Sequence, residues 1–97
     1  MIMLFANKIR RLRIEKQLLQ RQLAASLEID TPMYSKIERG DRPAKREQVL
    51  SIAQLLSTDE NELLTLWLAD KVMEVLEGEN ELVGKALEIV KENSNKL

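Results

Sequence analysis

Residues 30–40, DTPMYSKIERG, contain the signals for both the start and the end of one short helix. Asp30 is a good N-cap, and Pro32 is tolerated in a first turn, where the N–H that proline lacks would be unpaired anyway. Gly40 suits the residue just after a helix, because glycine adopts positive φ without strain. The segment therefore predicts a helix that ends near Arg39 and cannot belong to a long core helix.

This short helix is mostly polar. Met33 or Tyr34, together with Ile37, provides a single apolar stripe, which is enough to hold the helix against its neighbours. The remaining surface has nothing to bury. We expect that surface to contact a partner of the protein.

The rest of the chain is also predicted to be helical, because Leu, Glu, Lys, Gln, Arg and Ala dominate and aromatic residues make up 3%. Asp59 and Glu62 have the spacing of a capping box, and Gly78 interrupts the pattern near the end. The expected helices are residues 6–17, 20–27, 30–39, 46–56, 60–77 and 81–93. We predict an all-α fold with a five-helix domain (residues 1–66) and a C-terminal helical extension (residues 67–97).

Composition excludes several classes of site. The chain has no cysteine and no histidine, so it has no disulfide, no thiolate metal site and no histidine catalysis. Three glycines provide no phosphate-binding loop. Acidic pairs such as Glu60 and Glu62 lie at helix ends, where solvated carboxylates are usual. We therefore predict no metal, no cofactor and no enzymatic activity.

The first six residues form the longest apolar run, which is too short to span a membrane and lacks the flanks of a signal peptide. We interpret this run as part of the fold and expect a cytoplasmic protein without membrane contact. Residues 1–5, MIMLF, either extend the first helix or pack on the extension.

Charge divides the chain in two. Residues 1–46 contain eleven Lys/Arg and five Asp/Glu, a net charge of +6, whereas residues 47–97 contain four and eleven, a net charge of −7. A basic half fused to an acidic half indicates a polyanion-binding part and a part with another role. The alternative is an uneven scatter of solvated charges.

The helix of residues 20–27, the following turn and the helix of residues 30–39 form a helix-turn-helix. The string IRRLRIEKQLLQRQLAASLEIDTPMYSKIERG, residues 9–40, resembles the phage-repressor-like (Cro/Xre) DNA-binding family, and DENELL at 59–64 extends the resemblance to about residues 5–66. Its most specific parts are Gln20-x-x-Leu23-Ala24, the run from Ser35 to Gly40, and Arg13. The resemblance implies a lambda-repressor-like domain that binds double-stranded DNA.

By resemblance, the second helix of the motif enters the major groove and reads bases with its N-terminal part. The residues this implies for base readout are Thr31, Pro32, Met33 and Lys36. A lysine can donate to guanine O6 or N7, and a threonine can touch a base edge or a thymine methyl. For Met33, a role in the core is the alternative.

The resemblance also implies contacts to DNA phosphates, with Gln20 at the start of its helix. The implied residues are Gln20, Arg21, Ser35, Arg39, Arg42, Lys45 and Arg46. A solvated loop is the alternative for residues 42–46. Arg13 and Glu38 are assigned instead to a structural ion pair between the first helix and the third.

Two residues depart from the family pattern. Leu19 stands where Ser or Thr usually caps the helix, and Glu28 stands where the turn usually has Gly. A non-glycine residue at positive φ costs on the order of 1 kcal/mol, unless the turn adopts another conformation. Neither departure removes a group that faces DNA.

The extension has more apolar surface than one domain needs, which is typical of an interface. We predict a two-fold homodimer, with a helical cap on a monomer as the alternative. The assigned interface residues are Leu68, Val72, Val75, Leu76, Val83, Leu87 and Val90.

These patterns together predict a sequence-specific transcriptional regulator, most simply a dimeric repressor on a palindromic operator with half-sites ~34 Å apart. The alternative is an antitoxin or another interaction module whose extension binds a partner protein. No small-molecule site is evident from the sequence, and one between extension and domain stays an open alternative.

Overall fold

The structure is a computed structural model that describes residues 3–97, and the predicted all-α fold is confirmed. The described residues form α1 (Leu4–Glu15), α2 (Gln20–Ser26), α3 (Thr31–Glu38), α4 (Arg46–Leu55), α5 (Glu60–Leu76), α6 (Val83–Glu92) and the 3₁₀ helix η1 (Ser94–Lys96). None of these helices has both the length and the apolar character needed to cross a membrane.

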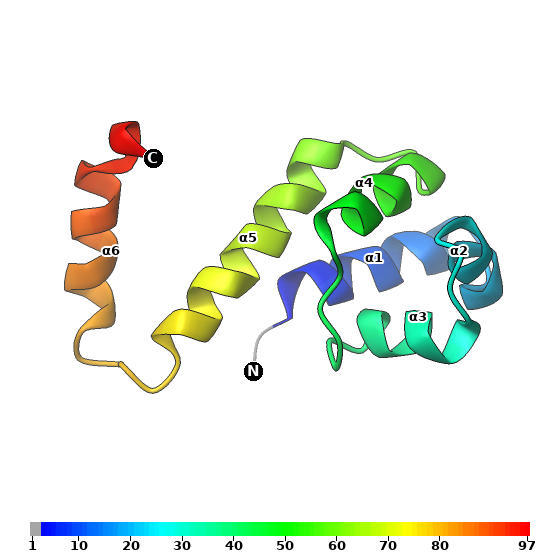
Figure 1. Ribbon diagram of the computed structural model, residues 1–97, viewed down its shortest axis with the longest axis horizontal. Helices are drawn as coiled ribbons and strands as arrows, with labels where there is room; N and C mark the ends of the chain where they lie inside the picture. Colours follow the sequence, from blue (N-terminus) through cyan, green and yellow to red (C-terminus); the bar gives the residue numbers. More distant parts are fainter. Residues whose placement is uncertain (1–2) are drawn as a thin grey trace.

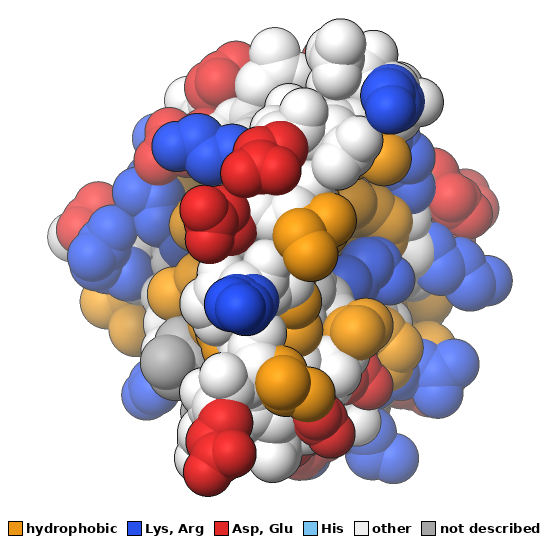
Figure 2. Space-filling model, turned by 90° about the vertical axis from the view of Figure 1, so that its left-hand side faces the viewer, with side chains coloured by type: hydrophobic (Ala, Val, Ile, Leu, Met, Phe, Trp, Pro, Cys, Tyr) orange, Lys and Arg blue, Asp and Glu red, His pale blue; other side chains and the backbone are white. Residues whose placement is uncertain are grey.

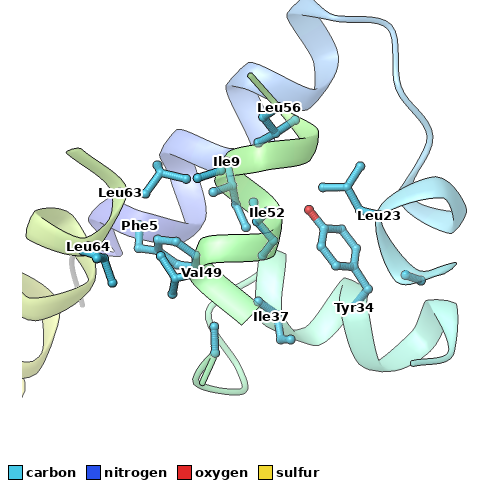
Figure 3. Close-up of a cluster of buried hydrophobic side chains, with 13 residues drawn as sticks. Phe5, Ile9, Leu23, Tyr34, Ile37, Val49, Ile52, Leu56, Leu63 and Leu64 are labelled. Atoms are coloured by element: carbon cyan, nitrogen blue, oxygen red, sulfur yellow. The ribbon is translucent and has the colours of Figure 1, made fainter. Parts of the chain in front are cut away.

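Helices α1 to α4 and the first half of α5 enclose one hydrophobic core (Figures 1 and 3). Each helix contributes the apolar positions of one face, so that the stripes predicted from the sequence converge. Tyr34 and Ile37 are the residues of α3 that reach this core, and both are almost fully buried. The other large, fully buried side chains are Ile9, Leu23, Val49, Ile52, Leu56 and Leu63.

The first four helices end in Schellman motifs, in which one residue at positive φ turns the chain out of the helix. After α3, the N–H of Asp41 donates to the Lys36 carbonyl at 2.9 Å and the N–H of Gly40 donates to the Ile37 carbonyl at 3.0 Å. The residues at positive φ are Gln17, Glu28, Gly40 and Ser57. Three of the four motifs therefore lack the glycine that this conformation favours.

Glu28 and Ser57 are expected to be strained at φ of 58° and 52°. Replacing each by glycine should raise the free energy of unfolding by about 1 kcal/mol, and the double variant shows whether the two effects add. Urea unfolding of the single and double variants measures this. Glu28→Ala is the control, since it removes the charge but keeps the Cβ. Equal stabilisation by alanine and glycine would contradict the backbone explanation.

The start of α1 is held by a residue of α5. Asp70 accepts hydrogen bonds from the backbone N–H groups of Leu4 at 2.9 Å and Phe5 at 3.0 Å. These donors have no partner within their own helix, and a carboxylate also complements the positive end of the helix dipole. Leu4 and Phe5 thus extend α1 and also bind α5, whereas Met1 and Ile2 lie outside the described residues.

The predictions for the starts of α1 and α5 are wrong in one detail each. The first helix begins two residues earlier than expected, at Leu4, because its cap comes from α5 rather than from the adjacent chain. Asp59 caps α5 by accepting from the N–H of Glu62 at 3.1 Å, but the Glu62 side chain pairs with Lys8 at 3.1 Å instead of completing a capping box.

Helix α5 continues beyond the core, and α6 stands on its far side from α1–α4 (Figure 1). The boundary predicted after residue 66 lies inside α5, and Trp67 just beyond it donates its Nε1–H to the Ala44 carbonyl at 2.8 Å. The last helix starts at Val83 rather than at 81, because residues 79–82 form a turn. Hydrophobic side chains are exposed among charged ones at this end of the molecule (Figure 2).

Candidate nucleic-acid interface

Helix α3 has one side in the core and one side in solvent. Asp30 fixes its start by accepting a hydrogen bond from the Met33 N–H at 2.8 Å. Thr31, Pro32 and Lys36 are exposed, and Met33 is half-buried between the two sides. The side chains assigned to base readout therefore share the first turns of α3, and Met33 is also in a position to contribute to packing.

An ion pair joins α1 to the end of α3. Arg13 Nη2 lies 2.7 Å from Glu38 Oε1, and Arg13 Nε lies 2.9 Å from Glu38 Oε2. The remaining guanidinium nitrogen, Nη1, donates to the Leu18 carbonyl at 2.9 Å. The pair expected from the resemblance is thus present in bidentate form, and its Glu38 side chain is only 2% exposed. It ties the C-terminal end of α3 to α1.

The Glu38 carboxylate stays charged in spite of its burial. Burial alone would raise the pKa of Glu38, but the hydrogen bonds and charge of Arg13, with smaller contributions from the nearby Tyr34 hydroxyl and the Gln20 amide, lower this pKa below its usual value. Burial, followed by the neighbouring carboxylate, raises the pKa of the Tyr34 hydroxyl. That hydroxyl is buried against the core (Figure 3) and has no well-aligned hydrogen-bond partner within residues 3–97.

A polar hollow lies where α1, the start of α2 and α3 meet. Its lining residues are Met3, Asn7, Arg10, Arg13, Gln20, Ser35, Glu38, Arg39 and Asp41. Arg13 is paired with Glu38, and Arg39 binds Asp41 at 3.0 Å. Arg10 makes no ion pair with any residue of the described chain. We therefore call this feature the arginine hollow.

The arginine hollow contains residues that the sequence did not point to. Asn7 and Arg10 lie on α1 and were not assigned to any site. The available signal was spacing, since Arg10 precedes Arg13 by three residues and such residues share a helix face. Gln20, in contrast, turns its amide toward Glu38 at 3.4 Å instead of pointing it only outward.

Leu19 gives α2 an unusual start. Leucine has no side-chain acceptor, so only the reciprocal half of a capping box is present, in which the Leu19 N–H donates to Gln22 Oε1 at 2.7 Å. The first N–H groups of α2 therefore donate no hydrogen bond to the side chain of the N-cap residue.

The remaining residues assigned to phosphates divide into two groups. Arg39 Nη1 donates to Ser35 Oγ at 3.2 Å, so these two side chains form a small network beside the arginine hollow. The other group has exposed side chains without ion pairs among residues 3–97, and consists of Arg21, Arg42, Lys45 and Arg46. Within the same range, acidic side chains form no cluster that could hold a metal ion.

Comparison with known families identifies the domain formed by α1–α4 and the start of α5. A family model described as a helix-turn-helix domain matches residues 4–66. The chain belongs to the helix-turn-helix domain family. This membership is consistent with the Cro/Xre type that the sequence resembles. No curated protein and no solved structure matches the chain.

The helix-turn-helix match covers α1–α4 and the core-facing part of α5. It includes the exposed side of α3, the ion pair and the arginine hollow, and it indicates a DNA-binding regulator. Trp67, Asp70 and all of α6 lie beyond the matched residues. The extension is therefore the part of this helix-turn-helix protein whose role the family does not describe.

Proposed function

We propose that the protein is a sequence-specific transcriptional repressor that binds a palindromic operator as a dimer, with α3 in the major groove. The observation that carries this proposal is the exposed side of α3 on a helix-turn-helix domain. A major groove admits one α-helix, and the N-terminal residues of such a helix contact base edges. Thr31, Pro32 and Lys36 have side chains free for that contact.

Binding to the DNA upstream of the gene for this protein tests the function as a whole. Fluorescence anisotropy should give a preference of about a thousandfold for this DNA over a scrambled duplex, with steep salt dependence. Equal and weak binding to both duplexes would contradict a specific regulator.

Lys36 is the side chain best suited to hydrogen-bond a base, because its ammonium is exposed on the second turn of α3. Lys36→Ala should weaken operator binding by about 1–3 kcal/mol and reduce the preference over scrambled DNA. The same anisotropy assay measures both. Lys85→Ala, on α6, removes an equal charge at the other end of the molecule and should change neither. An equal loss on specific and scrambled DNA would reassign Lys36 to a phosphate contact.

The arginine hollow has the chemistry of a phosphate site. Arg10 offers a guanidinium that makes no ion pair within residues 3–97, and Asn7 and Ser35 add neutral hydrogen-bonding groups to the same hollow. An arginine fork binds two phosphate oxygens at once. We infer that a phosphate of the operator backbone enters the arginine hollow next to α3.

Arg10→Ala should therefore weaken binding equally on operator and on scrambled DNA. It should also make the slope of log K against log salt shallower by about 0.9, the value for one phosphate. Arg11→Ala is a close control, since Arg11 is the next residue on α1 but lies outside the hollow, 3.9 Å from Glu15. Identical salt slopes for the two variants would contradict the assignment.

The dimer is proposed from the surface of the extension. Helix α6 contains no buried residue, although one face of it is apolar. Ten residues form an unstable helix in water unless a packed face supports them. Ala69, Val72, Met73 and Leu76 of α5 and Val83 and Leu87 of α6 line an open apolar groove. A second copy of the chain would cover both the groove and α6.

Two-fold symmetry fits this surface well. In such a pair, the α5–α6 arm of each protomer would lie in the groove of the other and form a four-helix bundle. The assigned residues Leu68, Val72, Val75, Leu87 and Val90 are exposed in the single chain, and Leu76 and Val83 are half-buried. Leu82 and Ile89 are further exposed apolar side chains of the extension.

The exposed apolar groove supports a second candidate function, in which the extension binds a different protein, as in an antitoxin. Sedimentation distinguishes the two candidates. A dimer at micromolar concentration supports the repressor, whereas a single species of monomer mass contradicts the homodimer and favours a partner of another kind.

A further inference from the structure

A cavity of about 420 Å³ lies between the C-terminal half of α5 and the helix-turn-helix domain. Its walls come from three parts of the chain, namely the start of α1, the end of α3 with the loop that follows it, and α5 beyond Leu66. We call it the α5 cavity. Its volume falls within the ~300–1,000 Å³ of small-molecule sites.

The buried walls of the α5 cavity are apolar. Phe5, Ile37 and Ala44 are almost fully buried core residues that also line the cavity. Trp67 forms a further wall, and its indole is held by the hydrogen bond to the Ala44 carbonyl at 2.8 Å. The Lys71 ammonium lies 4.4 Å from the centre of the same ring. These walls are suited to the apolar body of a small ligand.

The mouth of the α5 cavity is acidic. Four carboxylates line the cavity, whereas only two cations do. The carboxylates belong to Asp41, Asp70, Glu74 and Glu77, and the cations to Arg42 and Lys71. Asp41 is paired with Arg39, and Asp70 accepts the two N–H groups of α1.

Two of those carboxylates remain available. Glu74 and Glu77 form no ion pair within residues 3–97, and they lie three residues apart on α5 or just after it. Residues three apart face the same side of a helix, so their charges add at one edge of the mouth.

We propose that the α5 cavity is an effector site for a small organic cation, with an apolar body against Trp67 and Phe5 and an ammonium group at Glu74 and Glu77. The cavity supplies both parts of this recognition, since its buried walls are apolar and its lining has four carboxylates against two cations. An anionic ligand of the same shape would meet more carboxylates than cations.

The position of the α5 cavity links it to DNA binding, and this part of the inference rests on the proposed function. One wall is the loop at residues 40–44, which contains Arg42 and leads directly to Lys45 and Arg46. The opposite wall is α5, which leads to the surface proposed for the dimer (Figure 1). A ligand held between the two walls would favour one distance between them over others. A ligand at one site regulates a second site only if it binds the two conformations with different affinity.

Binding is tested without DNA by NMR on the 15N-labelled full chain. Trp67 is the only tryptophan, so the spectrum has a single indole N–H signal, which comes from the cavity wall. Three probes share one body and differ in charge, namely 3-phenylpropylamine, 3-phenylpropanol and 3-phenylpropionate. At low salt, the amine should shift this signal with a Kd about tenfold lower than that of the carboxylate.

Variants locate the charge selectivity. Glu74→Gln/Glu77→Gln should remove most of the preference for the amine while the neutral alcohol binds as before. Glu88→Gln/Glu92→Gln, at exposed positions of α6 outside the cavity, should retain the preference. Equal affinities of the native protein for amine and carboxylate, or shifts confined to the groove of Val72 and Leu87, would overturn the proposed site.

A second titration tests regulation. Adding 3-phenylpropylamine to the protein–operator complex should change the operator Kd by at least about threefold, and the Gln double variant should not respond. An unchanged Kd in the native protein would overturn the effector role. Absence of operator binding at any amine concentration would instead contradict the proposed DNA-binding function, while the NMR titration still decides whether the cavity binds the cation.

Discussion

Arg13→Ala is expected to lower the free energy of unfolding by about 3–5 kcal/mol, because it leaves the Glu38 carboxylate buried without its main partner. The Glu38 side chain is 2% exposed and the Arg13 side chain 14% exposed, so the pair is largely shielded from water in the native protein. The Gln20 amide, at 3.4 Å, is too distant to compensate. Chemical denaturation of native and variant protein measures the loss.

Two further variants show that the effect belongs to the pair. Arg11→Ala removes an exposed arginine that pairs with Glu15 at 3.9 Å and should cost less than about 1 kcal/mol. Arg13→Met/Glu38→Met removes both buried charges and should be more stable than Arg13→Ala, since no unpaired charge remains. A loss below about 1 kcal/mol for Arg13→Ala would contradict a buried, fully engaged pair.

The same pair gives a defined pH dependence. Because the pKa of Glu38 is lowered in the folded state, its contribution to stability is complete above the unfolded value of 4.5 and is lost as pH falls through the lowered folded value. Glu38→Gln has no proton to bind at this position. The stability difference between native protein and Glu38→Gln should therefore shrink below about pH 4.5, and a constant difference would contradict the assigned shift.

Local signals were sufficient to predict α3. Asp30 and Gly40 determine the backbone conformation only of the few residues next to them. The structure places Asp30 at the N-cap of α3 and Gly40 just after its C-terminus. The helical periodicity of the other segments was also local, so the all-α fold followed from it. The partnership of Arg13 with Glu38 came from the family resemblance, because no local pattern relates residues 25 positions apart.

Contacts between distant segments could not be predicted in this way. Asp70 caps α1 across 66 positions, and Lys8 rather than the backbone of Asp59 takes the Glu62 side chain. Each of these contacts depends on which helices lie side by side. A short stretch of sequence carries no information about that arrangement. The arginine hollow was not predicted for the same reason, and a site at the place of the α5 cavity was left only as an open alternative, because separate parts of the chain enclose each of them.

Val72→Glu/Leu87→Glu is expected to convert the proposed dimer into a monomer that is still folded. Both side chains line the apolar groove, and they are 46% and 43% exposed in the single chain, so the new carboxylates remain hydrated in a monomer. In a two-fold interface the change buries four carboxylates, each at a cost of several kcal/mol. Sedimentation at micromolar concentration should show monomer mass, with circular dichroism and thermal unfolding of the domain nearly unchanged.

Operator binding then distinguishes a dimer that reads two half-sites from a monomer that reads one. On the full palindrome, the double variant should lose about a hundredfold or more in affinity, because the second domain is no longer held at high effective concentration. On a single half-site its affinity should equal that of the native protein, since α3 and the arginine hollow are untouched. Ile14→Glu places the same charge on an exposed apolar residue of α1 and should leave the sedimenting mass unchanged. If Val72→Glu/Leu87→Glu still sediments at dimer mass, the dimer contact lies elsewhere. If the variant loses equal affinity for the half-site and the palindrome, the extension supports the fold of the DNA-binding domain and does not hold two domains together.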